Sequence, residues 1–287
     1  MTELPYLTDE ALRLFINAAL QEDIGEGDHS TLGAVPASKQ CTARLLVKDD
    51  GILAGVSLAE RIFKQYDSSL KVEIKLADGA RIHKGDVAFT VVGPARSVLT
   101  TERLVLNCMQ RMSGIATYTH RLSQLIEGTH ARLMDTRKTT PNFRLIEKWA
   151  VAIGGGLNHR FALYDMVMLK DNHIDLAGGI RVAVANTRTY LQERQKKLRI
   201  EVETRNLAEV EEAMAVGGMD VIMLDNMSLT DMKKAVALIN GRYKTEASGG
   251  INETTLRAVA ECGVDYISVG ALTHGAKSLD LSLKVIK

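Results

Sequence analysis

The pattern of hydrophobic and polar positions divides the chain into two parts at about residue 131. In the first part, Thr8 is placed to cap a helix whose apolar residues recur at helical spacing. Residues 42–92 then alternate with period two, interrupted by a helical pattern at 57–66. Residues 97–126 are strongly helical, and Ser113-Gly114 predicts a break in that helix. This part therefore predicts an α+β sandwich, an antiparallel or mixed sheet with helices on one face.

The second part repeats a strand followed by a helix. Helical periodicity connects several of the strand-like runs, and the spacing suits short βα units. The predicted strands are 131–135, 164–169, 198–203, 220–225, 243–248 and 265–270, and the clearest helices are 207–216, 229–239 and 253–261. Together they predict an α/β fold whose second domain is an incomplete barrel of six to seven strands. A seventh strand could lie near residues 110–120, where the pattern does not define it.

The C-terminal tail leaves the barrel rhythm. Leu279, Leu281, Leu283 and Val285 alternate with period two, which predicts a strand that returns to the N-terminal sheet. We therefore predict a sandwich domain over 1–112 that includes the returning strand 277–287, and a barrel domain over 113–276.

Composition limits the classes of partner. The 36 Lys and Arg residues nearly equal the 35 Asp and Glu residues, which argues against a surface that coats nucleic acid. The three cysteines form no C-x-x-C pair and no metal pattern, so each reads as a small apolar residue. We find no apolar run of the ~20 residues that cross a bilayer. We expect a cytoplasmic protein that binds neither nucleic acid nor membrane.

Cations follow two of the predicted barrel strands. Arg137 and Lys138 come after the first strand and Lys170 after the second, with His159 and Arg160 between them. In parallel α/β folds the carboxyl ends of the strands form the ligand site, so these cations predict a pocket for an acid with several negative charges. The alternative is a set of structural ion pairs, and His159 fits a structural histidine equally well. By spacing alone, Arg103 and Arg111 are solvated residues on a helix.

Acidic residues end the next two strands. Glu203 and Asp225 suit Mg²⁺, which binds few carboxylates and shares its ligands with phosphate groups. They could instead neutralise the lysines. Glu201 lies two residues earlier on the same strand face and competes with Glu203 for this role.

Glycine-containing loops follow the last two strands. Ser248, Gly249 and Gly250 precede a predicted helix, whereas Val269, Gly270 and Ala271 follow the final strand, with His274 just after. Glycines allow backbone N–H groups to approach phosphate, and the last two loops of such barrels commonly bind one. Simple turn formation is the alternative.

These motifs, taken in order, resemble the quinolinate phosphoribosyltransferase family. The resemblance covers nearly the whole chain. It includes EDIGEGD at 22–28, TER at 101–103, DTRKTTP at 135–141, GGG at 154–156, LKDNH at 169–173, EVE at 201–203, LDN at 224–226 and EASGGI at 246–251. One departure is an apparent extra residue in the loop 216–219, on the side away from the site, where we expect no effect on chemistry.

The resemblance implies a sandwich domain, a barrel of seven strands, and a homodimer in which Arg103 reaches the partner's site. It implies that Arg137, His159, Arg160 and Lys170 line the quinolinate pocket, with Thr136 beside them and Lys138 between the two substrates. Glu203 and Asp225 would lie near the ribose and Mg²⁺. The 5-phosphate site would comprise Ser248, Gly249, Gly250, Val269, Gly270, Ala271 and His274. Lys138, Lys170, Glu203 and Asp225 would be the catalytic residues.

The implied reaction joins quinolinate to 5-phosphoribosyl 1-diphosphate and releases carbon dioxide and diphosphate, as in NAD biosynthesis. Three alternatives stay open at this point. They are a related transferase for another anionic aromatic substrate, such as the relative associated with molybdate transport, a phosphate-binding lyase or isomerase, and a non-catalytic binding protein of the same fold.

Overall fold

The structure, a computed structural model, describes residues 4–286 and divides into two compact units. The first unit comprises Met1–His120, Thr139–Gly155 and Leu272–Lys287, and the second comprises Arg121–Lys138 and Gly156–Ala271. Segment 139–155 thus groups with the N-terminal part of the chain, although it follows the first strand of the predicted barrel.

The sheet of the first unit has four strands in the order β12-β1-β5-β3, and its neighbouring strands are antiparallel. The strands are β1 (Gln40–Val47), β3 (Lys71–Ile74), β5 (Val87–Pro94) and β12 (Leu281–Ile286). Ala43, Leu45 and Val47 are buried, as their alternation predicts. The tail strand pairs with β1, which confirms the predicted return of the chain end to this sheet.

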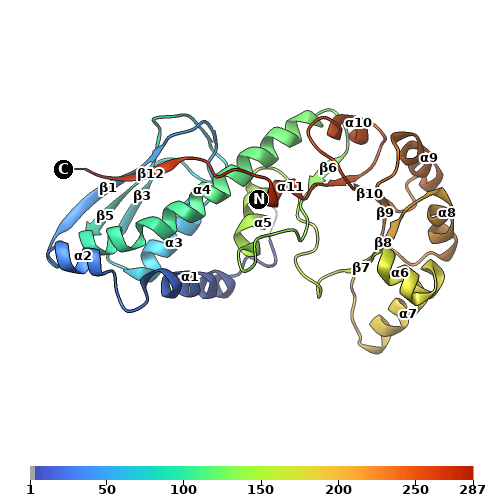
Figure 1. The fold of residues 1–287 in the computed structure, drawn as a ribbon, viewed down its shortest axis with the longest axis horizontal. Helices are drawn as coiled ribbons and strands as arrows, with labels where there is room; N and C mark the ends of the chain where they lie inside the picture. Colours follow the sequence, from blue (N-terminus) through green and yellow to red (C-terminus); the bar gives the residue numbers. More distant parts are fainter. Residues whose placement is uncertain (1–3, 287) are drawn as a thin grey trace. The chain divides into compact units, whose positions relative to one another are not determined.

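Helices α3 (Val56–Tyr66) and α4 (Ala95–Leu125) lie along one side of this sheet (Figure 1). The other elements of the unit are α1 (Asp9–Ile24), α2 (His29–Ala34), α5 (Arg144–Ile153) and a small hairpin of β2 (Gly51–Ile52) and β4 (Arg81–Ile82). The Thr8 hydroxyl accepts a hydrogen bond from the Ala11 N–H, as the cap prediction requires. Asp28, the last residue of the EDIGEGD segment, caps α2, a helix that the sequence pattern does not reveal.

Helix α4 runs through 31 residues without the break predicted at Ser113-Gly114. Gly114 is present because the chain approaches closely there: a Cβ on it would lie 1.9 Å from the Lys277 carbonyl oxygen. The Ser113 hydroxyl accepts the Ala54 N–H at 2.9 Å. The suggested strand near 110–120 is therefore wrong, because these residues are helical. The helix also continues across the predicted domain boundary at 112/113.

The second unit is a six-stranded parallel sheet in the order β6-β11-β10-β9-β8-β7. Its strands are β6 (Arg132–Met134), β7 (Val167–Leu169), β8 (Ile200–Thr204), β9 (Val221–Asp225), β10 (Lys244–Ser248) and β11 (Tyr266–Ser268). All six lie within or beside the predicted runs. Within residues 4–286 this sheet has six strands, and an isolated parallel bridge joins Met134 to Leu157 beside β6.

Helices lie along the outer side of this sheet (Figure 1). They are α6 (Asp171–Ala177), α7 (Ile180–Glu193), α8 (Leu207–Val216), α9 (Leu229–Ile239) and α10 (Leu256–Ala260). The short helix α11 (Ala271–His274) follows β11, and all but its first residue group with the first unit. The predicted helices 207–216 and 229–239 are confirmed to the residue, because Asn206 and Ser228 cap them through their side chains. The predicted helix 253–261 is shorter, since a turn closed by Asn252 and Thr255 precedes it.

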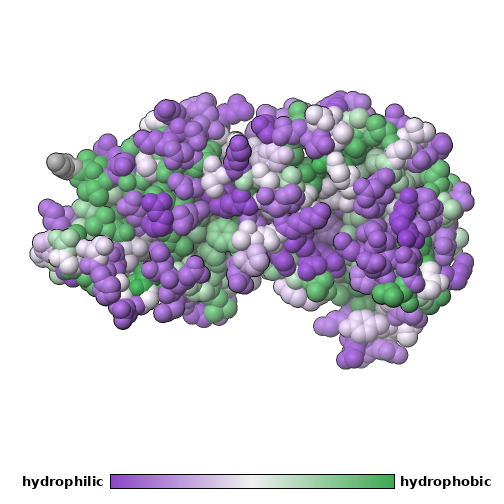
Figure 2. All heavy atoms as spheres, viewed as in Figure 1, coloured by the Kyte–Doolittle hydropathy of each residue, from purple (hydrophilic) through white to green (hydrophobic). Residues whose placement is uncertain are grey.

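Hydrophilic residues cover much of the surface in the view of Figure 2. Among residues 4–286, no helix combines the length and apolar character that a membrane span requires. Cys108 is 1 % exposed, and burial raises the pKa of its thiol to about 12, in line with the prediction of a small apolar core residue.

Candidate active site

The candidate site residues follow the carboxyl ends of the six parallel strands. Because the strands are parallel, these ends share one edge of the sheet. The predicted residues there are Thr136, Arg137 and Lys138 after β6, Lys170 after β7, Glu203 in β8, Asp225 at the end of β9, Ser248, Gly249 and Gly250 at the end of β10, and Val269, Gly270 and Ala271 after β11.

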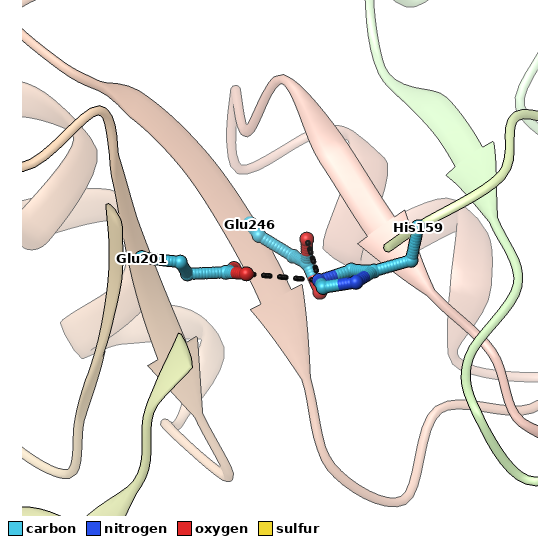
Figure 3. Close-up of side chains that lie close together, drawn as sticks. All are labelled: His159, Glu201 and Glu246. Carbon is cyan, nitrogen blue, oxygen red and sulfur yellow. Dashed lines mark hydrogen bonds and ion pairs between the residues drawn. The ribbon is translucent and has the colours of Figure 1, made fainter. Parts of the chain in front are cut away.

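Contacts of His159 show that the sheet is curled. Its backbone lies two residues beyond Leu157, which bridges to Met134 beside β6. Its ring nevertheless reaches Glu201 of β8, with 2.8 Å between Nε2 and Oε2, and Glu246 of β10, with 3.5 Å (Figure 3). A side chain from one end of the sheet can reach strands in its middle only when they face one another. The strands therefore enclose a barrel-like interior lined by charged groups.

Two arginines lie close together in this unit. Arg160 is 9 % exposed, and burial lowers the pKa of its guanidinium, as does the positive charge of Arg137. The buried Nε of Arg137 has no hydrogen-bond partner among the described residues. A buried donor without a partner is costly, and so are like charges held together, unless an anion joins them. This arrangement is suited to a carboxylate ligand.

The loops that carry these arginines are held by hydrogen bonds. The buried carboxylate of Asp135 accepts the Asn158 amide at 2.7 Å and the His159 backbone N–H at 2.9 Å. The Arg160 guanidinium donates to the Met166 carbonyl at 3.1 Å. The Thr136 hydroxyl accepts the Lys138 N–H at 3.1 Å and shapes the loop that leaves the Lys138 side chain exposed. The cationic pocket is therefore preorganised by neutral and acidic neighbours.

Glu203 and Asp225 form the acidic part of the site. Glu203 is 8 % exposed, and burial raises the pKa of its carboxyl, as does the charge of Asp225. The Lys170 charge and the Asp171 N–H, 3.4 Å from Oε1, act in the opposite direction. Two carboxylates that repel each other at the mouth of a sheet have the donor set that Mg²⁺ prefers. Glu201, the competing candidate for this role, is instead hydrogen-bonded to the His159 ring.

The glycine loop after β10 has a conformation that only glycine adopts easily. Gly249 and Gly250 have φ of 96° and 62°, and a Cβ on Gly249 would lie 2.3 Å from the Asn226 side-chain oxygen. The helix predicted to follow begins only at Leu256 and has 5 residues. Its dipole can therefore contribute little, and any phosphate here would depend on the loop N–H groups.

Two predicted site residues belong to the first unit. Arg103 lies exposed on α4, as its spacing predicts, and His274 is the exposed last residue of α11. Arg111, in contrast, is not the solvated residue predicted from spacing. It binds the fully buried Glu147 carboxylate at 2.8 Å and donates to the carbonyls of Ala276 and Thr273.

Sequence reasoning overlooked Glu246 as a site residue. It is 1 % exposed and points to the same face of β10 as Ser248, two residues later. The period-two rule that paired Glu201 with Glu203 would have found it. Arg111 carried no such signal, because its partners are distant in the sequence.

A curled parallel sheet with paired arginines, paired acids and a glycine loop at one edge defines an enzyme of the α/β-barrel class for anionic substrates. Residues 9–113 match the family model of the quinolinate phosphoribosyl transferase N-terminal domain, and residues 115–284 match that of the C-terminal domain. The chain belongs to the quinolinate phosphoribosyltransferase family.

Individual relatives agree with this assignment. The chain is 48 % identical to the chloroplastic nicotinate-nucleotide pyrophosphorylase (carboxylating) of Oryza sativa, over 96 % of this chain and 77 % of that protein. It is 46 % identical to quinolinate phosphoribosyltransferase (decarboxylating) 1b of Nicotiana tabacum, over 96 % and 82 %. The crystal structure of NadC from Streptococcus pyogenes superposes with a TM-score of 0.91 at 41 % identity, covering 100 % of both chains.

Proposed function

We propose that the carboxyl edge of the curled sheet binds quinolinate beside 5-phosphoribosyl 1-diphosphate and transfers the phosphoribosyl group to the pyridine nitrogen. Loss of carbon dioxide then gives nicotinate mononucleotide, and diphosphate is the other product. This is the decarboxylating reaction for which the relatives are named, a step of NAD biosynthesis. The observation that carries the assignment is the Arg137–Arg160 pair. Its two charges repel, and the Nε of Arg137 has no hydrogen-bond partner in the part of the chain that the structure describes.

Quinolinate is a planar dianion, and the cationic pocket matches it in charge and shape. A guanidinium binds a carboxylate through two parallel N–H bonds, which fixes the plane of the acid as well as its position. Arg137 and Arg160 therefore take the two carboxylates. Lys170 and His159 complete the lining, and Lys138, exposed at the end of its loop, lies between the two substrates.

Glu203 and Asp225 would hold Mg²⁺ together with the diphosphate group. Burial and mutual repulsion raise the pKa of Glu203, and a divalent cation beside the two carboxylates would relieve both effects. When bound, the ion neutralises charge on the departing diphosphate. The same two carboxylates stabilise the positive charge that develops on the ribose ring as the C1–oxygen bond breaks.

The remaining loops position the sugar phosphate. The backbone of Ser248, Gly249 and Gly250 and that of Val269, Gly270 and Ala271 provide N–H groups for the 5-phosphate, with His274 as a further donor. Gly250 supports this role, since a Cβ on it would meet no atom within 4 Å, so that side of the loop is open to a ligand.

The reaction follows from this positioning. The pyridine nitrogen forms its bond to the ribose C1 carbon as diphosphate leaves with the bonding electron pair. The ring is then a pyridinium, which accepts the electrons left when the adjacent carboxyl group departs as carbon dioxide, and a proton replaces that group. The enzyme contributes orientation and charge, without a covalent intermediate on the protein.

We also propose that the enzyme is a homodimer in which Arg103 completes the partner's quinolinate site. The exposed position of Arg103 on α4 supports this, because the residue is available to a second chain. The balanced charge of the sequence supports small-molecule partners in place of nucleic acid. A cytoplasmic location stays a prediction of the sequence.

A direct assay tests the function. The protein is incubated with Mg²⁺ and phosphoribosyl diphosphate, with either quinolinate or nicotinate, and carbon dioxide and diphosphate are measured. Equal amounts of both products with quinolinate, and neither with nicotinate, are expected. Diphosphate release with nicotinate but not quinolinate would contradict the proposal and favour the related transferases for other anionic aromatic substrates.

A further inference from the structure

The side chains of His159, Glu201 and Glu246 form a buried trio (Figure 3). The three side chains are 7 %, 0 % and 1 % exposed, and one ligand atom from each lies within 4.8 Å of the others. The second carboxylate oxygens, Oε1 of Glu201 and of Glu246, have no hydrogen-bond partner among the described residues. Such burial of two carboxyl groups costs stability, so the trio calls for a functional explanation.

The hydrogen bonds of the ring define its tautomer. The backbone N–H of Arg160 donates to His159 Nδ1 at 2.7 Å, so Nδ1 carries a lone pair and no proton. The ring proton therefore lies on Nε2, which donates to Glu201 Oε2 at 2.8 Å. A proton on Nδ1 would point at the Arg160 N–H, so two donors would face each other and the hydrogen bond would be lost. Because Glu201 accepts the proton on Nε2, Nδ1 stays unprotonated and can accept the Arg160 N–H.

The charges around the ring support this arrangement. Burial lowers the pKa of Arg160, and the negative charge of Glu201 acts in the opposite direction and helps to keep the guanidinium charged. Burial raises the pKa of Glu246 well above its ordinary value, as does the Glu201 charge. This shift favours the neutral form of Glu246, whereas the carboxylate that lies nearest the His159 ring is that of Glu201.

We infer that Glu201 is a positioning residue for the pocket: by accepting the His159 Nε2 proton, it leaves Nδ1 to hold the Arg160 main chain and so fixes where the Arg160 guanidinium points. Substrate specificity then depends on a carboxylate that need not touch the substrate. Naming quinolinate as the affected ligand rests on the proposed function, whereas the tautomer itself does not.

Nitrogen-15 NMR of the imidazole tests the tautomer without any substrate. The chain has 7 histidines, and a His159→Gln variant identifies the His159 signal by its loss. We expect the wild-type ring as the Nε2–H tautomer, and a mixture with Nδ1–H in Glu201→Leu, which keeps the side chain's size but has no acceptor. A wild-type Nδ1–H ring, or an unchanged ring in the variant, would overturn the inference even if the enzymatic assignment holds.

Steady-state kinetics test the consequence. In Glu201→Leu we expect the quinolinate KM to rise about tenfold or more, since a lost hydrogen bond to a charged group is worth that much, and the phosphoribosyl diphosphate KM to stay within about twofold. Glu201→Gln retains an acceptor oxygen and should restore part of the loss. If both KM values rise together, the residue is merely structural and the inference fails.

Val202→Ala is the matched control. Val202 is a fully buried neighbour on β8 whose side chain points to the opposite face, so the variant loosens the same strand without touching the ring. Its quinolinate KM should match that of the wild-type enzyme, and an increase equal to that of Glu201→Leu would overturn the positioning role.

A metal ion between the three side chains is the competing explanation, because His and Glu are possible ligands. Elemental analysis of the purified enzyme after dialysis against a chelator separates the two. Retained activity with no tightly bound transition metal supports the hydrogen-bonded trio. A stoichiometric metal that is lost in Glu201→Leu would overturn it.

Discussion

The two units bury carboxylates in opposite ways. In the first, Glu147 is fully buried but completely paired: Oε1 accepts from Arg111 and the Thr140 hydroxyl, and Oε2 accepts the Thr140 N–H at 3.0 Å. In the second, Glu201 and Glu246 are equally buried, and each has one oxygen without a hydrogen-bond partner within residues 4–286. Full pairing is typical of a group that holds a fold together, whereas incomplete pairing is costly and persists where function requires it.

The cations show the same contrast. Arg111 in the first unit binds a carboxylate and two backbone carbonyls. Arg137 and Arg160 in the second unit are close enough to repel each other, and one donor is unpaired. Burial alone therefore does not identify an active site. The useful sign is a buried charge whose pairing is unfinished, since a substrate can complete it.

The largest effect is expected when an arginine of the pocket is removed. Arg160→Ala or Arg137→Ala should lower kcat/KM for quinolinate by about 100-fold or more, because a bidentate bond to a carboxylate is lost. Arg205→Ala is the control, since Arg205 is an exposed arginine of the same unit that pairs with Asp175 and Glu209. Comparable losses in all three variants would remove the distinction between paired and unpaired arginines.

Arg103, an exposed arginine of the first unit, tests whether two subunits share one active site. Arg103→Ala should fold normally yet lose most activity, because the partner's site lacks a cation. Mixing it with the inactive variant Glu203→Gln should restore activity, up to about one quarter of wild type if subunits exchange randomly into dimers.

Native mass spectrometry should show the mixed dimer in that experiment. A mixed dimer that stays inactive would contradict a shared site. Glu203→Gln mixed with Arg160→Ala is the control, and it should recover nothing if Arg103 alone is contributed by the partner.

Glu147 should affect stability more than chemistry. Glu147→Ala leaves Arg111 and the Thr140 amide without their acceptor, which should lower the free energy of unfolding by about 3 kcal/mol. Urea unfolding measures this change. Glu203→Gln should show the reverse pattern, near-normal unfolding with a severe loss of kcat. If Glu147→Ala is as stable as wild type, complete pairing does not indicate a structural role.

Glu246 should give a smaller effect, visible in the pH dependence of stability. Its pKa is raised in the folded protein, so above the ordinary value of about 4.5 the native state binds a proton that the unfolded chain has lost. Stability should therefore fall as pH rises from that value toward the raised one. The surrounding groups are His159, Glu201, Asp135 and Ser268.

Glu246→Gln cannot ionise and should flatten this decline. The measurement is the urea midpoint of wild type and variant between pH 5 and 8, a range above the reference pKa of glutamate. Parallel curves would mean that Glu246 does not titrate abnormally. In that case the contrast between the two buried carboxyl environments would lose its electrostatic basis.

Local pattern predicted much of the fold. Strand β8 and helices 207–216 and 229–239 follow from periodicity and from side-chain caps at Asn206 and Ser228, all of which are local signals. Gly114 misled the reading because a glycine that permits close packing looks like one that breaks a helix. The partners of Arg111 lie 36 and 162 residues away, and periodicity carries no information about such contacts.

The sequence predicted which kinds of residue form the site, but not which of them face the mouth of the sheet and which are buried beneath it. Glu201 and Glu203 share one face of β8, so the sequence alone could not decide which one faces the mouth. The structure distinguishes them, because Glu201 is hydrogen-bonded to His159. Glu246 was missed for a related reason: a glutamate inside a strand has no local mark of its function until the strand opposite it is known.

The most direct test of the central claim is a crystal structure of the enzyme with quinolinate. We expect the two carboxylates of the ligand to lie against Arg137 and Arg160, with N–O distances of roughly 2.7–2.9 Å. The Nε of Arg137 should then donate a hydrogen bond to the ligand. Quinolinate bound elsewhere, or an Arg137 that stays unpaired in the complex, would contradict it.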